Sequence, residues 1–314
     1  MYFYLKKYIR DLSNNSKFLK AIYSFLNVIK TNSTSKMSDE LFAKIKYREN
    51  TGKTLDLENP RFFNEKLWWL KINNRNSLMT QCSDKVEVRK YLKSIGLENL
   101  LTEIYGIYDK AEDIPFKELN GKYFIKCNHV SGINALYDSS NKDNFDCDKI
   151  VKKFNSALKM NYYFQSREWN YKNIKPKILV ENFLETTEPL LDFRFFCFHG
   201  KVKMIFVDID TAAEDGTHNP SAKRNIYDRE FNLMNFTVGR QNFDTSLVKK
   251  PNNLNVMIEY AERISNPFVF CRVDLYNLNG DIKFGEITFY PGGATQQFSN
   301  EEADLEVSSW LNIK

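Results

Sequence analysis

Hydrophobic residues recur with a helical period in the first part of the chain and alternate with polar residues in much of the remainder. The helical pattern predicts a helix that begins at Ser38, with Leu41, Phe42 and Ile45 on its apolar face, and helices over 64–72, 83–95, 150–160 and 255–265. The alternating pattern predicts strands over 123–128, 177–184, 192–198, 202–209 and 271–276, and one more that begins at Phe284. Together these patterns predict an α+β protein.

Three regions differ in their pattern: a basic, amphipathic helical extension over 1–36, a mostly helical region over 37–120, and an α+β core over 121–314. The extension fits a helix packed on the domain, or a helix in peripheral contact with a membrane, and the sequence leaves both open. No apolar run is long enough to span a membrane and no secretory signal is visible. We therefore expect a cytoplasmic protein, with the inner face of the membrane as the place of any such contact.

Composition excludes several functional classes. The chain has 314 residues, of which 42% are hydrophobic and 15% aromatic, enough to bury a sizeable core. The net charge is only +5 and the basic residues are spread out, so we expect no nucleic-acid partner. The five cysteines show no Cys-x-x-Cys spacing, which argues against a zinc site and favours reduced thiols. The oligomeric state does not follow from the sequence.

The most informative pattern is a predicted hairpin near the C-terminus, whose strands meet at Asn279-Gly280. Asp274 in its first strand can face Glu286 in its second, and Arg272 shares the face of Asp274 because side chains alternate along a strand. Two carboxylates suit Mg²⁺, because phosphate oxygens and water usually complete the coordination shell of that ion. A guanidinium suits an anion beside the metal. The alternative is a solvated strand face that binds no ligand.

A second candidate site lies at the end of the predicted strand 123–128. Lys126 suits a phosphate group, and the backbone N–H groups of Ser131 and Gly132 suit phosphate oxygens. His129 borders the same loop and is a further candidate for a phosphate contact. For Lys126, a structural lysine at a strand edge is the alternative. Neither a Walker loop nor a Gly-x-Gly-x-x-Gly turn is present, so P-loop and nicotinamide-binding folds are poorly supported.

Several segments, taken in order, resemble the ATP-grasp fold, in particular its TupA-like branch, which is found in gene clusters for cell-surface polysaccharides. The resemblance covers most of the chain after about residue 59. The segments that carry it are Phe63-Asn64-Glu65-Lys66-Leu67-Trp68-Trp69-Leu70-Lys71, Ser83-Asp84-Lys85, Val88-Arg89, 123–132, 178–184, 192–198 and 284–293.

The resemblance implies that ATP is held between two α+β subdomains, a phosphate-loop subdomain over 121–180 and a metal-binding subdomain over 181–314. The residues implied to bind ATP are Lys126, His129, Ser131, Gly132, Glu181, Asn182, Phe183, Leu184, Asp192 and Arg194. Among them, Lys126 would contact phosphate and the loop 129–134 would close over it. The backbone of 181–184 would read adenine as a hinge strand, and Asp192 would bind the ribose hydroxyls, with Arg194 nearby.

The resemblance also implies Mg²⁺, bound by Asp274, Glu286 and Thr288. Arg272 matches an arginine that holds the substrate carboxylate or the transferred phosphate, and it would act in catalysis together with Lys126. General ATP-grasp enzymes have Glu-x-Asn where this chain has Glu286-Ile287-Thr288. A hydroxyl is a weaker metal ligand than an amide oxygen, so the resemblance does not decide between one and two Mg²⁺ ions.

The implied activity is ATP-dependent ligation of a carboxylate to an amine through an acylphosphate. The suggested acid is a uronic acid sugar or an acidic amino acid of an envelope glycan, so the expected partners are a small-molecule or glycan-linked carboxylate and an amine. The alternative is a glycosyltransferase that uses a sugar nucleotide, because Asp208-Ile209-Asp210 has the spacing of a metal-binding Asp-x-Asp motif. A non-catalytic nucleotide-binding protein is a third interpretation, against which the retained Lys126, Asp274 and Glu286 argue.

Overall fold

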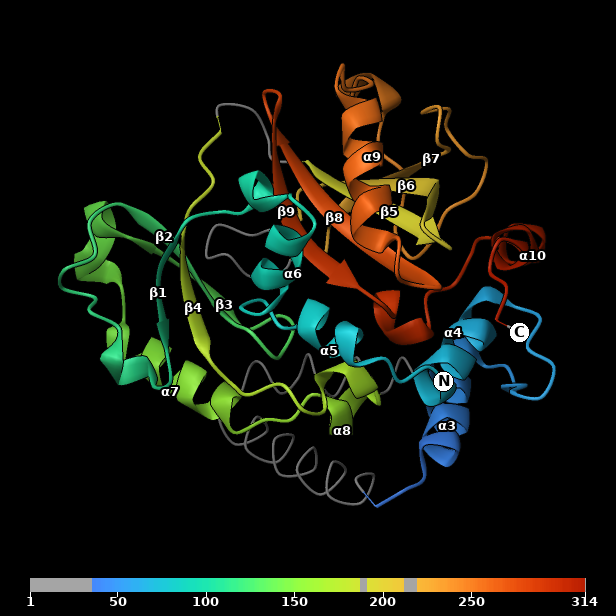
Figure 1. Cartoon of the computed structure of the whole chain (residues 1–314), viewed down its shortest axis with the longest axis horizontal. Coiled ribbons are helices and arrows are strands. Elements are labelled where there is room, and N and C mark those ends of the chain that lie inside the picture. Colours follow the sequence, from blue (N-terminus) through green and yellow to red (C-terminus); the bar gives the residue numbers. More distant parts are fainter. Residues whose placement is uncertain (1–35, 187–190, 212–218, 314) are drawn as a thin grey trace.

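Two antiparallel sheets form the frame of the molecule (Figure 1). The computed structural model describes residues 36–186, 191–211 and 219–313. The larger sheet has the order β7-β6-β5-β8-β9 and the smaller sheet the order β1-β4-β2-β3. The strands are β1 (Ile104–Tyr108), β2 (Lys122–Cys127), β3 (Asn134–Asp138), β4 (Ile178–Asn182), β5 (Asp192–Phe198), β6 (Lys201–Ile209), β7 (Lys223–Tyr227), β8 (Phe270–Leu278) and β9 (Asp281–Thr288). The α+β class predicted from the sequence is confirmed.

The five-stranded sheet contains two hairpins, one of which is the predicted hairpin at Asn279-Gly280. β5 and β6 meet at His199 and Gly200, and β8 and β9 meet at Asn279 and Gly280. All four turn residues have positive φ angles, as tight hairpin turns require. Helix α9 (Leu254–Ser265) lies on this sheet and buries an apolar stripe, as its helical pattern predicts. β7 begins at Lys223, and residues 212–218 before it lie outside the described residues.

A group of helices packs with the five-stranded sheet in one hydrophobic core. They are α3 (Asp39–Thr51), α4 (Phe63–Asn73), α5 (Ser77–Ser83), α6 (Val88–Ser94) and α10 (Glu301–Ser309). Ser38 caps α3 by accepting a hydrogen bond from the N–H of Leu41, as predicted. The predicted apolar face of α3 is partly wrong, because Leu41 and Ile45 are 49% and 39% exposed. The helix instead buries the adjacent stripe, on which Phe42 packs against Trp68 of α4.

The single helix predicted over 83–95 is also wrong, because the chain breaks at Asp84 into α5 and α6. Asp84 has extended backbone angles, and its Oδ1 accepts hydrogen bonds from the N–H of Val86 at 2.8 Å and from Nδ2 of Asn128 at 2.9 Å. The bond to Asn128 joins the break to the end of β2. A contact between residues so far apart in the chain leaves no trace in the helical period.

The four-stranded sheet has its own core, separate from that of the five-stranded sheet. Helix α7 (Cys147–Leu158) packs on it and buries Phe154 and Ala157. The edge strands β1 and β3, each five residues long, were not predicted from the sequence pattern. β1 comes from within the region 37–120 and pairs with β4. The remaining short elements are α8 (Tyr163–Ser166) and the 3₁₀ turns η1 (Glu98–Leu100), η2 (Ala111–Asp113), η3 (Ser139–Asn144), η4 (Trp169–Tyr171), η5 (Thr245–Leu247) and η6 (Pro291–Ala294).

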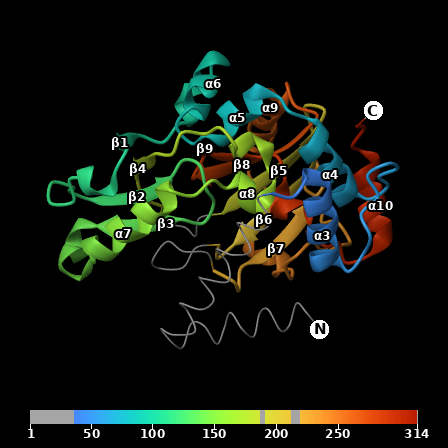
Figure 2. The ribbon, with the colours of Figure 1, turned by 90° about the horizontal axis from the view of Figure 1, so that it is seen from below.

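The two sheets lie side by side in both views, with β9 as the strand of the larger sheet that is nearer to the smaller one (Figures 1 and 2). Helix α7 marks the outer end of the smaller sheet, and α3, α4 and α10 gather at the opposite end of the molecule. In the part of the chain that the structure describes, no helix is long and apolar enough to cross a membrane. The predicted amphipathic extension over 1–36 lies almost entirely outside the described residues.

Candidate active site

A cavity of about 320 Å³ opens between the two sheets and is lined by half of the predicted site residues. Its walls come from β2 and the loop after it, from the start of β5, and from the β8–β9 hairpin. The lining residues are Lys85, Phe124, Lys126, Val130, Ser131, Gly132, Asn134, Asp192, Arg194, Thr211, Asp274, Tyr276, Gly285 and Glu286. Residues from both sheets therefore meet around one space.

Asp274 and Glu286 lie directly opposite each other on β8 and β9. Simple alternation along β9 would put Glu286 on the same face as the buried Phe284. A bulge removes this conflict, because Leu275 pairs with Phe284 while Asp274 pairs with Glu286, so Gly285 has no partner. The bulge turns Glu286 to the cavity while its apolar neighbours on β9 stay buried.

Gly285 is the residue type that this bulge needs. A Cβ added there would lie 3.1 Å from the backbone oxygen of Asp274 and 3.3 Å from Cε2 of Tyr276, closer than side chains usually approach. The close approach of β9 to β8 at this point therefore depends on the absence of a side chain.

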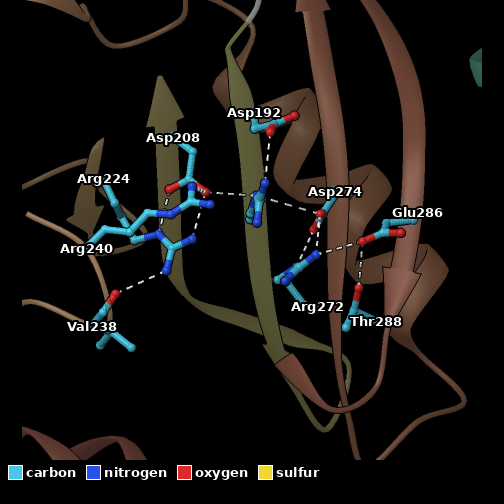
Figure 3. Close-up of polar contacts among 10 residues, drawn as sticks. Asp192, Asp208, Arg224, Val238, Arg240, Arg272, Asp274, Glu286 and Thr288 are labelled. Atoms are coloured by element: carbon cyan, nitrogen blue, oxygen red, sulfur yellow. Dashed lines mark hydrogen bonds and ion pairs between the residues drawn. The ribbon is translucent and has the colours of Figure 1, made fainter. Parts of the chain in front are cut away.

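Arg272 ties the two carboxylates together (Figure 3). Its Nε and Nη2 donate to the two oxygens of Asp274, each at 2.6 Å, and Nη2 also donates to Oε1 of Glu286 at 2.9 Å. The hydroxyl of Thr288 donates to the same Oε1 at 3.0 Å. Among the described residues, the cavity lining includes neither Arg272 nor Thr288. Both side chains orient the carboxylates, and the hydroxyl of Thr288 points to Glu286 and not to the cavity.

The two carboxylates differ in their electrostatic surroundings. Burial raises the pKa of Asp274 to about 6, although Arg272 and Arg194 favour its charged form. Burial acts in the same direction on Glu286, but Arg272 and Lys85 more than offset it and hold the pKa of Glu286 below its ordinary value. A cation that arrived at this pair would reduce the cost of burying the charge of Asp274.

Two lysines face the same cavity. Lys126 on β2 forms an ion pair with Glu181 on β4, with 2.6 Å between Nζ and Oε2. Lys85, at the break between α5 and α6, donates to the carbonyl oxygen of Val130 at 3.2 Å. Burial lowers the pKa of Lys85, and the charge of Glu286 acts against this shift. The sequence pattern did not single out Lys85, because a continuous helix over 83–95 gives it no special position.

Of the residues predicted to bind phosphate in the loop after β2, some line the cavity and one does not. Ser131 and Gly132 line the cavity, and Gly132 has a φ angle of 78°. His129 is buried, with its ring nitrogens 3.2 Å from Oδ1 of Asn128 and 3.1 Å from the carbonyl oxygen of Ala157. Its ring therefore packs in the core of the smaller sheet. The predicted phosphate contact of the His129 side chain is corrected on this ground.

The predicted hinge segment 181–184 has two of its backbone N–H groups already in use. The N–H of Asn182 donates to the carbonyl oxygen of Glu103 and that of Phe183 to the carbonyl oxygen of Lys122, both at 3.0 Å. Leu184 forms no such bond within the described part of the chain. The amide of Leu184 is thus available to a ligand, whereas a backbone contact from Asn182 or Phe183 N–H is not supported.

An ionic network extends from the two carboxylates across the five-stranded sheet (Figure 3). Arg194 lies among three carboxylates, with 2.9 Å from Nη2 to Asp192, 3.2 Å from Nε to Asp208 and 3.8 Å from Nε to Asp274. Asp192 and Arg194 both line the cavity. Asp192, the residue predicted to bind the ribose hydroxyls, is therefore held in place by Arg194. The sequence pattern placed both residues on the same strand face.

Asp208 forms the other end of this network. Its carboxylate is fully buried and accepts hydrogen bonds from Nε and Nη2 of Arg224 at 2.5 and 2.7 Å and from Nη1 of Arg240 at 2.7 Å. Arg194 pairs with the same carboxylate. Asp210 is exposed and lies beyond the end of β6 with a φ angle of 56°. The carboxylate of Asp208 is saturated by guanidinium groups, so an Asp-x-Asp metal site at Asp208 and Asp210 is not supported.

Comparison with models of protein families identifies the chain. The model described as TupA-like ATPgrasp matches residues 65–311, which is most of the sequence. The chain belongs to the TupA-like ATP-grasp family. The family resemblance that the sequence motifs carried is thus confirmed. A search of curated protein sequences found no match.

Several solved ligase structures are similar to this TupA-like ATP-grasp protein at low sequence identity. An L-amino acid ligase from Bacillus licheniformis is 13% identical with a TM-score of 0.45, over 74% of this chain and 49% of that one. A D-alanine–D-alanine ligase from Bacillus anthracis is 14% identical with a TM-score of 0.42, over 73% and 62% of the two chains. A phosphoribosylamine–glycine ligase from Thermotoga maritima is 14% identical with a TM-score of 0.41, over 69% and 50%. The chain spans about half to three-fifths of the length of these proteins.

An ATP-grasp protein is expected to use ATP with a divalent metal. The side chains around the cavity can therefore be compared with the ligands that such a metal requires. Within the described ranges, no three His, Cys, Asp or Glu side chains form a metal-binding group. Asp274 and Glu286 nevertheless supply two carboxylates on neighbouring strands. Mg²⁺ commonly takes one or two protein carboxylates and completes its shell with substrate phosphates and water. These residues fit a Mg²⁺ ion that arrives with a nucleotide.

Proposed function

We propose that this TupA-like ATP-grasp protein uses ATP to join a carboxylate to an amine through an acylphosphate. The observation that carries the proposal is the cavity in which two lysines, Lys85 and Lys126, face two carboxylates, Asp274 and Glu286. Lysines suit phosphate oxygens, and paired carboxylates suit the metal that accompanies a triphosphate. The family supports the same chemistry.

The proposed reaction has two steps. A carboxylate oxygen of the acid attacks the γ-phosphorus of ATP, the bond from that phosphorus to the β–γ bridging oxygen breaks, and ADP leaves. The amine nitrogen then attacks the acyl carbon and loses a proton, and inorganic phosphate leaves. Mg²⁺, when bound, neutralises charge on the phosphate oxygens.

The side chains of the cavity act mainly by position and charge. Lys85 and Lys126 stabilise the negative charge that develops on the phosphoryl oxygens, and the N–H groups of Ser131 and Gly132 donate to them. Arg272 holds Asp274 and Glu286 in the orientation that the metal requires. Asp192 accepts hydrogen bonds from the ribose, and the free N–H of Leu184 contacts the adenine.

We further propose that the acid is a uronic acid sugar or an acidic amino acid of a cell-envelope glycan. Membership of the TupA-like family supports this class, because the branch occurs in polysaccharide gene clusters. Such a role fits a cytoplasmic protein that works at the inner face of the membrane. The glycosyltransferase alternative loses its support with the burial of Asp208.

Acyl-phosphate trapping tests the proposal. The protein would be incubated with Mg-ATP and, in turn, D-glucuronic acid, L-glutamate and D-glutamate, with hydroxylamine present to convert an acylphosphate to a hydroxamate. We expect hydroxamate and ADP to form only when an acid is present. Absence of acid-dependent ADP together with absence of ATP binding would contradict the ligase function.

Asp274→Asn and Glu286→Gln should each lower the rate of hydroxamate formation by about 100-fold or more, because both lose a charge that the metal needs. Melting followed by circular dichroism should change little in Glu286→Gln, whereas Asp274→Asn should lower the melting temperature because Arg272 and Arg194 lose a buried carboxylate, so rates are compared per folded molecule. Asp210→Asn, an exposed neighbour of the network, is the matched control and should leave both quantities unchanged. If Asp274→Asn unfolds the chain but leaves turnover per folded molecule intact, the role of Asp274 is structural.

A further inference from the structure

The two carboxylate oxygens of Glu286 have different surroundings (Figure 3). Oε1 accepts hydrogen bonds from Nη2 of Arg272 at 2.9 Å and from the hydroxyl of Thr288 at 3.0 Å. Among the described residues, no hydrogen bond or ion pair reaches Oε2. The side chain of Glu286 is 44% exposed and lines the cavity, whereas that of Asp274 is 8% exposed. A cation in the cavity therefore meets a carboxylate with one oxygen free and one in use.

Arg272 already provides a positive charge beside Oε1. Its Nη2 bridges the two carboxylates, because it donates to Oδ2 of Asp274 at 2.6 Å as well as to Glu286. Arg272 and Thr288 lie directly opposite each other on β8 and β9, so the guanidinium and the hydroxyl approach Oε1 from the same end of the hairpin. The side chain of Arg272 is 9% exposed, so water and salt screen its charge only weakly.

The side chain at position 288 offers little to a second cation. General ATP-grasp enzymes have an asparagine there, whose amide oxygen accepts but never donates. Thr288 instead donates its one hydroxyl proton to Oε1. Within the described part of the chain, Thr288 does not line the cavity. A second ion beside Oε1 would have to displace two hydrogen-bond donors and would lie next to the charge of Arg272.

We propose that this protein holds a single Mg²⁺ ion with ATP, at Oε2 of Glu286 and at Asp274, and that the Arg272 guanidinium takes the place of a second ion. The inference rests on the ligase function proposed above and specifies its metal requirement. Two protein carboxylates suffice for one Mg²⁺, because phosphate oxygens and water complete its shell. Asp274 can contribute although it is bonded to Arg272, because each of its oxygens keeps a further lone pair.

An arginine suits the position of a second cation. The guanidinium stays charged throughout the ordinary pH range and presents its N–H donors in a rigid geometry. Its charge is therefore in place before the nucleotide arrives, whereas a second metal ion would have to bind from solution. The reaction should then depend on the complex of one Mg²⁺ with one ATP, and free Mg²⁺ in excess over ATP should not raise the rate further.

Counting of bound manganese tests the inference, because Mn²⁺ takes the same oxygen ligands as Mg²⁺ and gives an electron paramagnetic resonance signal. The protein would be mixed with Mn²⁺ and a nonhydrolysable ATP analogue, and ultrafiltration would separate bound from free ligands. We expect one Mn²⁺ for each molecule of analogue that is retained with the protein. The resonance should show the six lines of an isolated ion and not the broad signal of a coupled pair.

Three substitutions test the role of Thr288. Thr288→Asn adds the amide oxygen that a second ion needs, so the count should rise from one Mn²⁺ to two and the six-line signal should broaden. Thr288→Val removes the hydroxyl, and the count should stay at one because Thr288 is not a ligand. Thr211→Asn is the matched control, because Thr211 lines the cavity but follows β6, which β5 separates from β8. Its count should also stay at one.

Two Mn²⁺ ions per analogue in the wild-type protein, or activation by Mg²⁺ in excess over ATP, would overturn the inference. Loss of the single ion in Thr288→Val would show that Thr288 binds the metal and would overturn it as well. A count of one in Thr288→Asn would contradict the role given to the threonine. If Thr288→Asn does not fold, the wild-type count and Thr288→Val decide. A wild-type protein that retains no analogue would contradict the proposed use of ATP itself.

Discussion

Asp208 illustrates how single residues in this protein depend on buried charge. Its carboxylate is inaccessible to solvent and is shared by Arg194, Arg224 and Arg240. Asp274 is likewise a buried carboxylate paired with a guanidinium, because Arg272 donates two hydrogen bonds to it. Charges buried in this way stay costly unless every partner is present, so removal of one member affects all the others.

Asp208→Asn should lower the free energy of unfolding by about 3–5 kcal/mol, because three guanidinium groups would lose their shared carboxylate. Burial alone would raise the pKa of Asp208, but the arginines lower it below its ordinary value. The unfolded chain then binds this proton more readily than the folded protein does. The stabilisation is therefore complete above the ordinary Asp pKa of about 3.9 and is lost as the pH falls below it.

Urea unfolding between about pH 3 and about pH 7 measures this dependence. The difference between Asp208→Asn and the wild-type protein should be constant near neutral pH and shrink in acid. Asp210→Asn, at an exposed position, should change the free energy of unfolding by less than about 0.5 kcal/mol. A difference that did not vary with pH would mean that the network is not what lowers the pKa of Asp208.

At the scale of elements, two interruptions of regular structure position the site. The bulge at Gly285 turns Glu286 to the cavity, and the break at Asp84 brings Lys85 to the same cavity. In each case a regular element would have left the functional side chain elsewhere. The interruptions are therefore part of the site.

Gly285→Ala should lower the free energy of unfolding by about 1–3 kcal/mol, because the new Cβ would crowd backbone and side-chain atoms of β8. It should also lower hydroxamate formation, because relief of the crowding moves Glu286 away from Asp274. Urea unfolding and the trapping assay measure the two effects. Gly52→Ala, at a position with open space and a φ angle of 73°, should lower stability alone. Unaltered activity in a destabilised Gly285→Ala would show that the bulge does not control the position of Glu286.

Asp84→Ala should raise the KM for ATP by about tenfold, because it removes the hydrogen bonds that hold the break and thereby the position of Lys85. Initial rates of ADP release at several ATP concentrations would show the change. Asp146→Ala removes a comparable cap, at the start of α7, where Asp146 accepts from the N–H of Lys149. This control should lose about 1 kcal/mol of stability and keep the KM for ATP. Equal KM values in both variants would exclude a role of the break in nucleotide binding.

At the scale of the whole molecule, each sheet has a separate core and the cavity lies between them. The lysines and carboxylates that line the cavity come from both sides, with Lys126 on the smaller sheet and Asp274 and Glu286 on the larger one. A ligand that contacts both sides adds contacts between parts that otherwise have independent cores. Such a ligand should stabilise the entire protein.

A nonhydrolysable ATP analogue with Mg²⁺ should raise the melting temperature by about 4 °C at about 100 times its Kd. Differential scanning fluorimetry measures the shift, which UDP-glucuronic acid should not reproduce. Lys126→Met and Lys85→Met should each reduce the shift caused by the analogue, because each loses a phosphate contact. Stabilisation by the UDP-sugar but not by the ATP analogue would favour a sugar-nucleotide enzyme.

The sequence by itself determined the features that depend on neighbouring residues. The turn at Asn279-Gly280 and the alternation around Asp274 and Arg272 are local, and the structure has the hairpin that they predict. The α+β class and the family also followed from patterns and motifs in the chain. Turn conformation and side-chain alternation are properties of short segments, so no distant contact was needed to read them.

Only the tertiary structure decided which side chains meet. The ring of His129 packs in the core of the smaller sheet, and Asp208 pairs with three arginines. Lys85 lines the cavity because a hydrogen bond between Asp84 and Asn128 holds the helix break in place. The burial and the charge around a side chain depend on segments far away in the chain, and neither periodicity nor spacing carries that information.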